Sequence, residues 1–207
     1  MLAAPQVQAY LVDLDGTLYR PGLVKLGMTV ELVVFGAHRI AWLKAFRQEH
    51  ELMRHETASS GAEFLPSPFA VQLQRAADRL GVQASKLEAV VRDFMIERPS
   101  KWIRLAKNNS LLEEIATFHA RGGKTALVSD YPAERKLKAL EARSSFDVVI
   151  SNGEKSGLTR LKPAPAGYLM AAHALSVDPK NCLVLGDRSD ADGKAAEAAG
   201  MQFRLIR

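Results

Sequence analysis

The chain of 207 residues suits one globular domain with a modest insertion and leaves no room for a second large domain. Hydrophobic residues make up 47% and charged residues 25%, which excludes an intrinsically disordered chain and allows a sizeable core. The net charge is +5, and residues 20–109 alone account for it, with 14 Lys and Arg against 9 Asp and Glu. This basic balance is compatible with nucleic acid or another anion as a partner.

The sequence shows no sign of a membrane protein. No apolar run approaches the roughly 20 residues that cross a bilayer. Residues 1–10 lack the basic start and apolar stretch of a secretory signal, and the single Cys182 cannot form an internal disulfide. We therefore expect a cytoplasmic protein without a membrane partner, in which Cys182 is a packed core thiol.

Five short apolar segments predict the strands of a parallel sheet. The first covers residues 6–13 and ends in Asp-Leu-Asp-Gly, which is typical of a buried strand that runs into a tight loop. Further strands are expected over residues 124–130, 146–151, 181–187 and 202–206. Helices are expected over residues 110–120, 133–141, 164–175 and 191–199. This alternation indicates an α/β fold with a doubly wound, Rossmann-like parallel sheet covered on both faces.

The alternation of strands and helices stops between residues 23 and 109. Apolar residues in this stretch recur at helical spacing, as in Leu32, Phe35, Ile40, Leu43 and Phe46. We therefore predict an all-helical insertion over residues 23–109. The core domain then consists of residues 1–22 and 110–207.

Four segments place polar residues at the carboxyl ends of predicted strands or just before a predicted helix, where open α/β sheets bind ligands. Gly16 permits a tight turn in the first of these groups. Carboxylates from two strand ends make an oxygen-rich site that suits a hard cation such as Mg²⁺. The four groups are Asp13-Leu14-Asp15-Gly16-Thr17, Ser129-Asp130, Lys162-Pro163-Ala164-Pro165, and Gly186-Asp187 with Asp190 and Asp192.

The four groups together resemble the signature of the haloacid dehalogenase-like (HAD) hydrolase superfamily. That signature is an Asp-x-Asp-x-Thr/Val loop, a Ser or Thr at the end of the next core strand, a Lys before a later helix, and an acidic pair that begins with Gly-Asp. All four occur here in the family's order, between Asp13 and Asp192. The resemblance implies a HAD-like core with the helical insertion as a cap.

The resemblance assigns the central chemistry to two carboxylates. Asp13 would be the nucleophile that forms an aspartyl phosphate, and Asp15 would act as general acid and then general base. The dehalogenase branch of the superfamily lacks this second acid and works without metal, so Asp15 indicates a phosphatase.

The resemblance also implies a Mg²⁺ site. Its ligands would be the Asp13 carboxylate, the backbone carbonyl of Asp15, Asp187 and a second acidic residue. In the family this residue follows the Gly-Asp after three or four positions. That spacing favours Asp192 and leaves Asp190 with a local hydrogen-bonding role.

Further residues would bind the phosphoryl group. The resemblance implies that Ser129 and the backbone N–H groups of Leu14, Asp15 and Asp130 donate to its oxygens. Lys162 would neutralise its charge, and Thr17 would fix the loop. Asp130 departs from the Asn that is common in the family, but its expected contribution comes from the backbone. Arg188 either reaches the site or caps its loop.

The insertion carries a basic edge formed by Arg98, Lys101, Arg104 and Lys107. These residues are three positions apart, so they form either a solvated helix face or a contact with an anionic substrate. The five histidines are scattered, and we assign them no role.

The function that follows is that of a Mg²⁺-dependent phosphatase acting on a small phosphorylated metabolite. A phosphomutase of the same superfamily is the alternative, because it shares every motif and differs only in the group that accepts the phosphoryl. A phospho-acceptor receiver carries similar residues but not the Asp-x-Asp-x-Thr loop or a helical insertion. Charge alone suggests a non-enzymatic anion-binding or nucleic-acid-binding protein, and we expect no nucleic-acid partner. The sequence predicts neither the substrate nor the oligomeric state.

Overall fold

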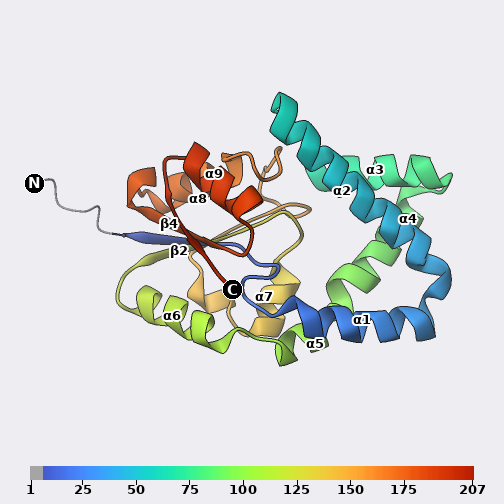
Figure 1. Cartoon of the computed structure of the whole chain (residues 1–207), viewed down its shortest axis with the longest axis horizontal. Coiled ribbons are helices and arrows are strands. Elements are labelled where there is room, and N and C mark those ends of the chain that lie inside the picture. Colours follow the sequence, from blue (N-terminus) through green and yellow to red (C-terminus); the bar gives the residue numbers. More distant parts are fainter. Residues whose placement is uncertain (1–6) are drawn as a thin grey trace, which may run out of the picture.

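A computed structural model describes residues 7–207, which contain a five-stranded, entirely parallel sheet. Its strand order is β3-β2-β1-β4-β5, so β1 lies at the centre between β2 and β4 (Figure 1). All five predicted strands are confirmed. Residues 1–6 lie outside the described part of the chain, and they include residue 6 of the first predicted strand and most of the segment in which no secretory signal was expected. The strands are β1 Ala9–Val12, β2 Lys124–Ser129, β3 Val148–Ser151, β4 Cys182–Gly186 and β5 Gln202–Leu205.

Helices cover both faces of the sheet, as the doubly wound prediction requires. One apolar cluster joins α6 and α7 to one face, and a second cluster, which includes buried Tyr168 and Cys182, joins α8 and α9 to the other. The predicted helix over residues 191–199 begins later than expected, because Ser189–Gly193 forms a π-helical turn. The helices are α6 Asn109–Ala120, α7 Glu134–Leu140, α8 Ala166–Leu175 and α9 Lys194–Ala198.

The insertion is helical, as predicted, and lies beyond the carboxyl end of β1 (Figure 1). Its first helix begins at Pro21, two residues before the predicted boundary, because proline is well suited to the first turn of a helix. No single helix within residues 7–207 is both long enough and apolar enough to cross a membrane. The helices are α1 Pro21–Phe35, α2 Ile40–Ser60, α3 Pro68–Leu80, α4 Ala84–Val91 and α5 Pro99–Leu105.

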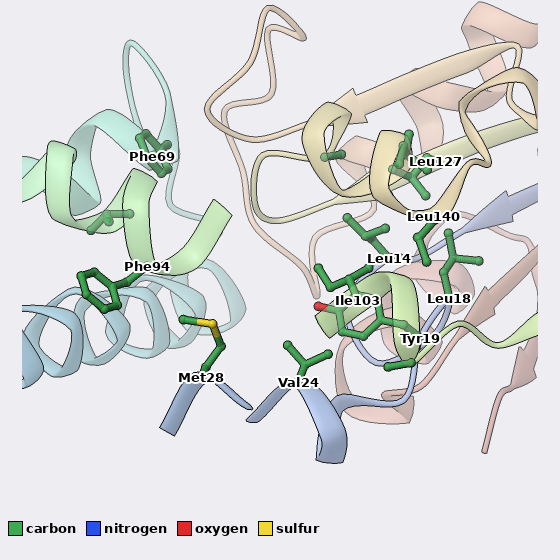
Figure 2. Packing of buried hydrophobic residues seen from close by; sticks show 14 of the residues in the cluster. Leu14, Leu18, Tyr19, Val24, Met28, Phe69, Phe94, Ile103, Leu127 and Leu140 are labelled. Atoms are coloured by element: carbon green, nitrogen blue, oxygen red, sulfur yellow. The ribbon is translucent and has the colours of Figure 1, made fainter. Parts of the chain in front are cut away.

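The insertion joins the sheet through a continuous apolar cluster and two adjacent connections. Tyr19 and Lys107 form an isolated antiparallel bridge, and the N–H of Arg20 donates to the carbonyl of Ala106 at 2.9 Å. The two chain segments that connect the insertion to the core therefore run side by side. Figure 2 shows the cluster that spans the loop after β1, α1, α5 and α7, with Leu14, Leu18, Val24, Met28, Ile103 and Leu140 among its members.

Helix α1 is held against α5 by one glycine and one carboxylate. A Cβ atom on Gly27 would overlap the Trp102 ring, so the two helices approach closely only because Gly27 has no side chain. The Trp102 Nε1–H donates to Glu31 Oε1 at 2.8 Å, and Lys101 pairs with the same oxygen at 2.7 Å. Glu31 is thus a buried acid whose charge is compensated from α5.

We expect Gly27→Ala to destabilise the protein by about 1–3 kcal/mol, because overpacking at Trp102 would force α1 and α5 apart. Chemical denaturation followed by circular dichroism measures this free energy of unfolding. The matched control is Gly22→Ala in the same helix, where the added methyl group meets no atom within 4 Å. Equal stability of the Gly27 and Gly22 variants would contradict the close α1–α5 contact.

Candidate active site

Three carboxylates meet where β1 and β4 end. Asp13 directly follows β1, Asp187 directly follows β4, and Asp192 lies in the π-helical turn after Asp187. Because β1 and β4 are paired neighbours, their carboxyl ends meet at the same edge of the sheet. One oxygen from each carboxylate lies within 4.8 Å of the others. Asp13 and Asp192 are buried, while Asp187 is partly exposed.

Two glycines permit this close approach. Gly16 has a φ of +99°, a conformation that residues with side chains rarely adopt, and a Cβ atom there would collide with the Asp187 carboxylate. A Cβ atom on Gly186 would likewise collide with Asp192. The turn expected at Gly16 is therefore present, and it brings the loop after β1 against the acid that follows β4.

Among residues 7–207, Lys162 is the one cation that contacts two of these carboxylates. Its Nζ donates to Asp13 Oδ1 at 2.6 Å and to the Val128 carbonyl at 3.0 Å, and it lies 2.8 Å from Asp192 Oδ1. Burial disfavours its charged form, but attraction to Asp13, Tyr168 and Asp192 outweighs burial and holds the pKa of Lys162 well above its usual value.

The three carboxylates carry more negative charge than Lys162 balances. Burial raises the pKa of Asp13 to about 7; Lys162 opposes this shift, and repulsion from Asp192 adds to it. Burial also raises the pKa of Asp187, again with repulsion from Asp192. A compact group of oxygen donors with surplus negative charge fits a hard divalent cation.

Asp15 has partners that the sequence did not predict. Lys136 of α7 donates to both of its carboxylate oxygens, at 2.6 and 2.7 Å, and the Tyr19 hydroxyl donates to Oδ1. Burial would raise the pKa of Asp15, but attraction to Lys136 prevails and lowers it. The carboxylate is therefore held ionised, the form in which it accepts a proton. Only the four-residue spacing of Tyr19 from Asp15 could have indicated one of these contacts.

The other predicted residues surround Asp13 and Lys162. The Thr17 hydroxyl donates to Asp13 Oδ2 at 2.9 Å, which fixes the carboxylate opposite Lys162. Asp130 Oδ1 accepts from the Lys162 N–H at 3.3 Å, so its side chain positions the lysine loop, a role not foreseen for it. Ser129 is buried at the end of β2, and its hydroxyl accepts from the Tyr131 N–H at 3.2 Å. Leu14 is fully buried in the loop between the two acids.

The structure separates Asp192 from Asp190. Asp192 faces the other carboxylates and accepts a hydrogen bond from the Tyr168 hydroxyl at 2.8 Å. Asp190 is exposed and forms an ion pair with Arg188 at 2.7 Å. Arg188 thus engages its own loop. Of the two residues that the spacing argument compared, Asp192 is the one that lies with Asp13 and Asp187.

Helix α2 of the insertion also contacts the site. The Arg54 Nε–H donates to the Lys162 carbonyl at 3.3 Å, and the buried guanidinium reaches Glu51 only at 3.5 Å. One turn earlier, the His50 ring stacks on Tyr131 at 4.5 Å between centroids. Sequence reasoning missed Arg54 and His50, because neither belongs to a recognisable motif.

Comparison with known proteins agrees with this arrangement. A family model of haloacid dehalogenase-like hydrolases matches residues 7–200. No curated protein matches the sequence significantly.

Several solved structures share the fold at low sequence identity. A 2-haloacid dehalogenase from Pseudomonas syringae pv. Tomato DC3000 is 17% identical with a TM-score of 0.63, over 97% of this chain and 86% of that one. The L-2-haloacid dehalogenase from Xanthobacter autotrophicus is 18% identical with a TM-score of 0.64, over 97% and 78%. The β-phosphoglucomutase from Clostridium difficile is 19% identical with a TM-score of 0.60, over 98% and 85%.

His50 makes stability depend on pH. Burial lowers its pKa, so the unfolded chain binds a proton more readily than the folded one, and stability falls as the pH drops below about 6.5. We expect His50→Gln to reduce the fall in Tm between pH 7.5 and 5.5. The control is His173→Gln on an exposed position of α8. An unchanged pH dependence in the His50 variant, measured by thermal denaturation, would argue against a buried neutral imidazole.

Proposed function

Because this chain belongs to the haloacid dehalogenase-like hydrolase family, we propose that it is a Mg²⁺-dependent phosphatase that hydrolyses a small phosphomonoester. The observation that carries this proposal is the convergence of Asp13, Asp187 and Asp192 within 4.8 Å, next to a second acid, Asp15. Neither the cation site nor the second acid is needed to displace a halide from carbon. Both are needed to transfer a phosphoryl group from a poor leaving group.

The residues present fit Mg²⁺. The carboxylates of Asp13, Asp187 and Asp192 and the backbone carbonyl of Asp15 would hold the ion, since oxygen donors with surplus negative charge are the ligands it prefers. When bound, Mg²⁺ would reduce the repulsion between the anionic nucleophile and the anionic phosphate.

Two carboxylates divide the chemistry. An Asp13 oxygen attacks phosphorus, the bond from phosphorus to the leaving oxygen breaks, and Asp15 in its protonated form supplies the proton that this oxygen needs. Water then attacks the aspartyl phosphate, Asp15 takes the water's proton, and phosphate leaves as Asp13 is restored. Lys136 holds Asp15 ionised in this structure, which favours the second of these steps and opposes the first, for which Asp15 must first take up a proton.

Neighbouring groups orient the reaction. Thr17 donates a hydrogen bond to one oxygen of Asp13 and Lys162 donates to the other, so the carboxylate keeps one orientation. Lys162 also stabilises the charge that spreads over the phosphoryl oxygens, and the Ser129 hydroxyl donates a hydrogen bond to one of these oxygens.

The helical insertion is proposed to act as a cap, with α2 facing the site. Arg54 is buried there with two long contacts, so most of its five donors are available to a further anionic group of the substrate. A substrate with a second anionic group also suits a phosphomutase, in which a substrate hydroxyl replaces water as acceptor. Release of inorganic phosphate distinguishes the two activities.

Asp13→Asn should abolish phosphate release, because an amide is not a competent nucleophile here. Asp15→Asn should reduce kcat about 10²–10⁴-fold for an alkyl phosphate, the usual contribution of general acid–base catalysis. The reduction should be smaller for an aryl phosphate, whose leaving group needs little protonation. Phosphate release from both substrates measures these effects.

The control for both variants is Asp78→Asn, an exposed acid in the insertion. Wild-type turnover by the Asp13 variant would exclude the aspartyl-phosphate mechanism. An equal loss for both substrates in the Asp15 variant would show that Asp15 does not protonate the leaving group.

Activity should require Mg²⁺ and should not be supported by Ca²⁺, which prefers more ligands at longer distances. Asp187→Ala or Asp192→Ala should raise the Mg²⁺ concentration for half-maximal activity by about tenfold or more. Asp190→Ala is the matched control, since Asp190 pairs with Arg188 instead. Full activity in excess chelator, or an equal effect of the Asp190 and Asp192 substitutions, would contradict this assignment.

A further inference from the structure

A second cluster of charged residues lies between α5 and α7, apart from the four site carboxylates. A cavity with a volume of about 250 Å³ opens there, and four of its six lining residues are cations. None of the acids of the candidate active site lines it. The lining residues are Ser100, Lys101, Arg104, Arg135, Lys138 and Ala139.

Helix geometry brings these cations together. Lys101 and Arg104 are three residues apart on α5, and Arg135 and Lys138 are three apart on α7, so each pair occupies one helix face. The neighbouring Lys136 points the other way, into the contact with Asp15. The two helices pack against each other, so residues from both basic faces line one cavity.

The four residues of the basic edge expected from the sequence do not share one environment. Arg98 pairs with Asp93 at 3.0 Å and Lys107 pairs with Glu141 at 2.6 Å, so both are neutralised at other places. Lys101 and Arg104 instead face α7. The cavity lies between the insertion and the core, which the sequence could not show because α5 and α7 are more than 25 residues apart.

The charge around the cavity is only half compensated. Lys101 pairs with the buried Glu31 at 2.7 Å, and Arg135 pairs with Glu97 at 2.8 Å. Within residues 7–207, no carboxylate lies within 4 Å of the charged groups of Arg104 or Lys138. The two uncompensated charges, on Arg104 and Lys138, favour an anion at this cavity.

We propose that this cavity is a second anion-binding site that takes the di- or triphosphate group of a small molecule. Two guanidinium groups can each bind phosphate oxygens in a bidentate manner, and two ammonium groups add point charges. A single carboxylate would leave most of these donors unused, whereas linked phosphates supply enough oxygens for the unpaired Arg104 and Lys138 and for the remaining donors of Lys101 and Arg135. The cations converge on one cavity instead of following a stripe, which favours a small ligand over a nucleic-acid backbone.

A ligand bound here would connect the insertion to the core. It would contact α5 from one side and α7 from the other, close to the antiparallel bridge between Tyr19 and Lys107. Because the ligand binds the folded arrangement of these helices and not the unfolded chain, it should raise the Tm.

The experiment measures binding of inorganic pyrophosphate and inorganic triphosphate by calorimetry, in chelator so that no divalent cation contributes. We expect saturable binding with a rise in Tm. Arg104→Gln combined with Lys138→Gln should weaken binding at least about tenfold, because it removes two charge-assisted contacts. Both residues are exposed and unpaired among the described residues, so the variant should fold and keep its hydrolytic activity.

The matched control is Lys44→Gln combined with Arg121→Gln, which removes the same charge from exposed positions outside the cavity. Unchanged binding in this control supports the site. The proposal is overturned if wild type does not bind either anion, if both double variants weaken binding equally, or if neither does, since the last result would place the anion outside this cavity. Tighter binding of a 12-residue oligonucleotide than of triphosphate would also overturn it. These outcomes do not depend on the proposed phosphatase activity, which is measured separately.

Discussion

The geometry of the site depends on the ion pairs that the buried ammonium group of Lys162 forms. This group lies between Asp13 and Asp192, two carboxylates that would repel each other without it. Removing one partner from such a buried group leaves an uncompensated charge, at a typical cost of about 3–5 kcal/mol. The strands supply the positions, but charge compensation by Lys162 makes three acids within 4.8 Å tolerable in the folded protein.

Much of this arrangement could be predicted from the sequence. Strands β1 to β4 have apolar centres, and the residues at their carboxyl ends meet because parallel neighbours end at one edge. The tight turn at Gly16 was also predictable, since the Asp-Leu-Asp-Gly sequence needs a residue that tolerates positive φ. The family resemblance added the expectation for Asp192, which lies buried beside Lys162.

The contacts of Lys136 and Arg54 could not be predicted, because each joins segments that are far apart in the sequence. Lys136 reaches Asp15 from a helix 121 residues further along the chain, and Arg54 reaches the Lys162 backbone across 108 residues. A single cation on a helix has no periodicity that distinguishes a buried role from a solvated one. Its partner is decided by how two elements pack, and packing is a property of the whole fold.

Helix α7 shows what this packing adds to the chemistry. One of its faces directs Lys136 to Asp15, and another lines the cavity shared with α5. A displacement of α7 relative to the sheet would change both environments together, because the same seven-residue helix carries Lys136 and three of the cavity residues. The position of Asp15 and the position of the insertion are therefore linked through α7, so an anion that holds α5 against α7 also favours the arrangement in which Lys136 retains Asp15.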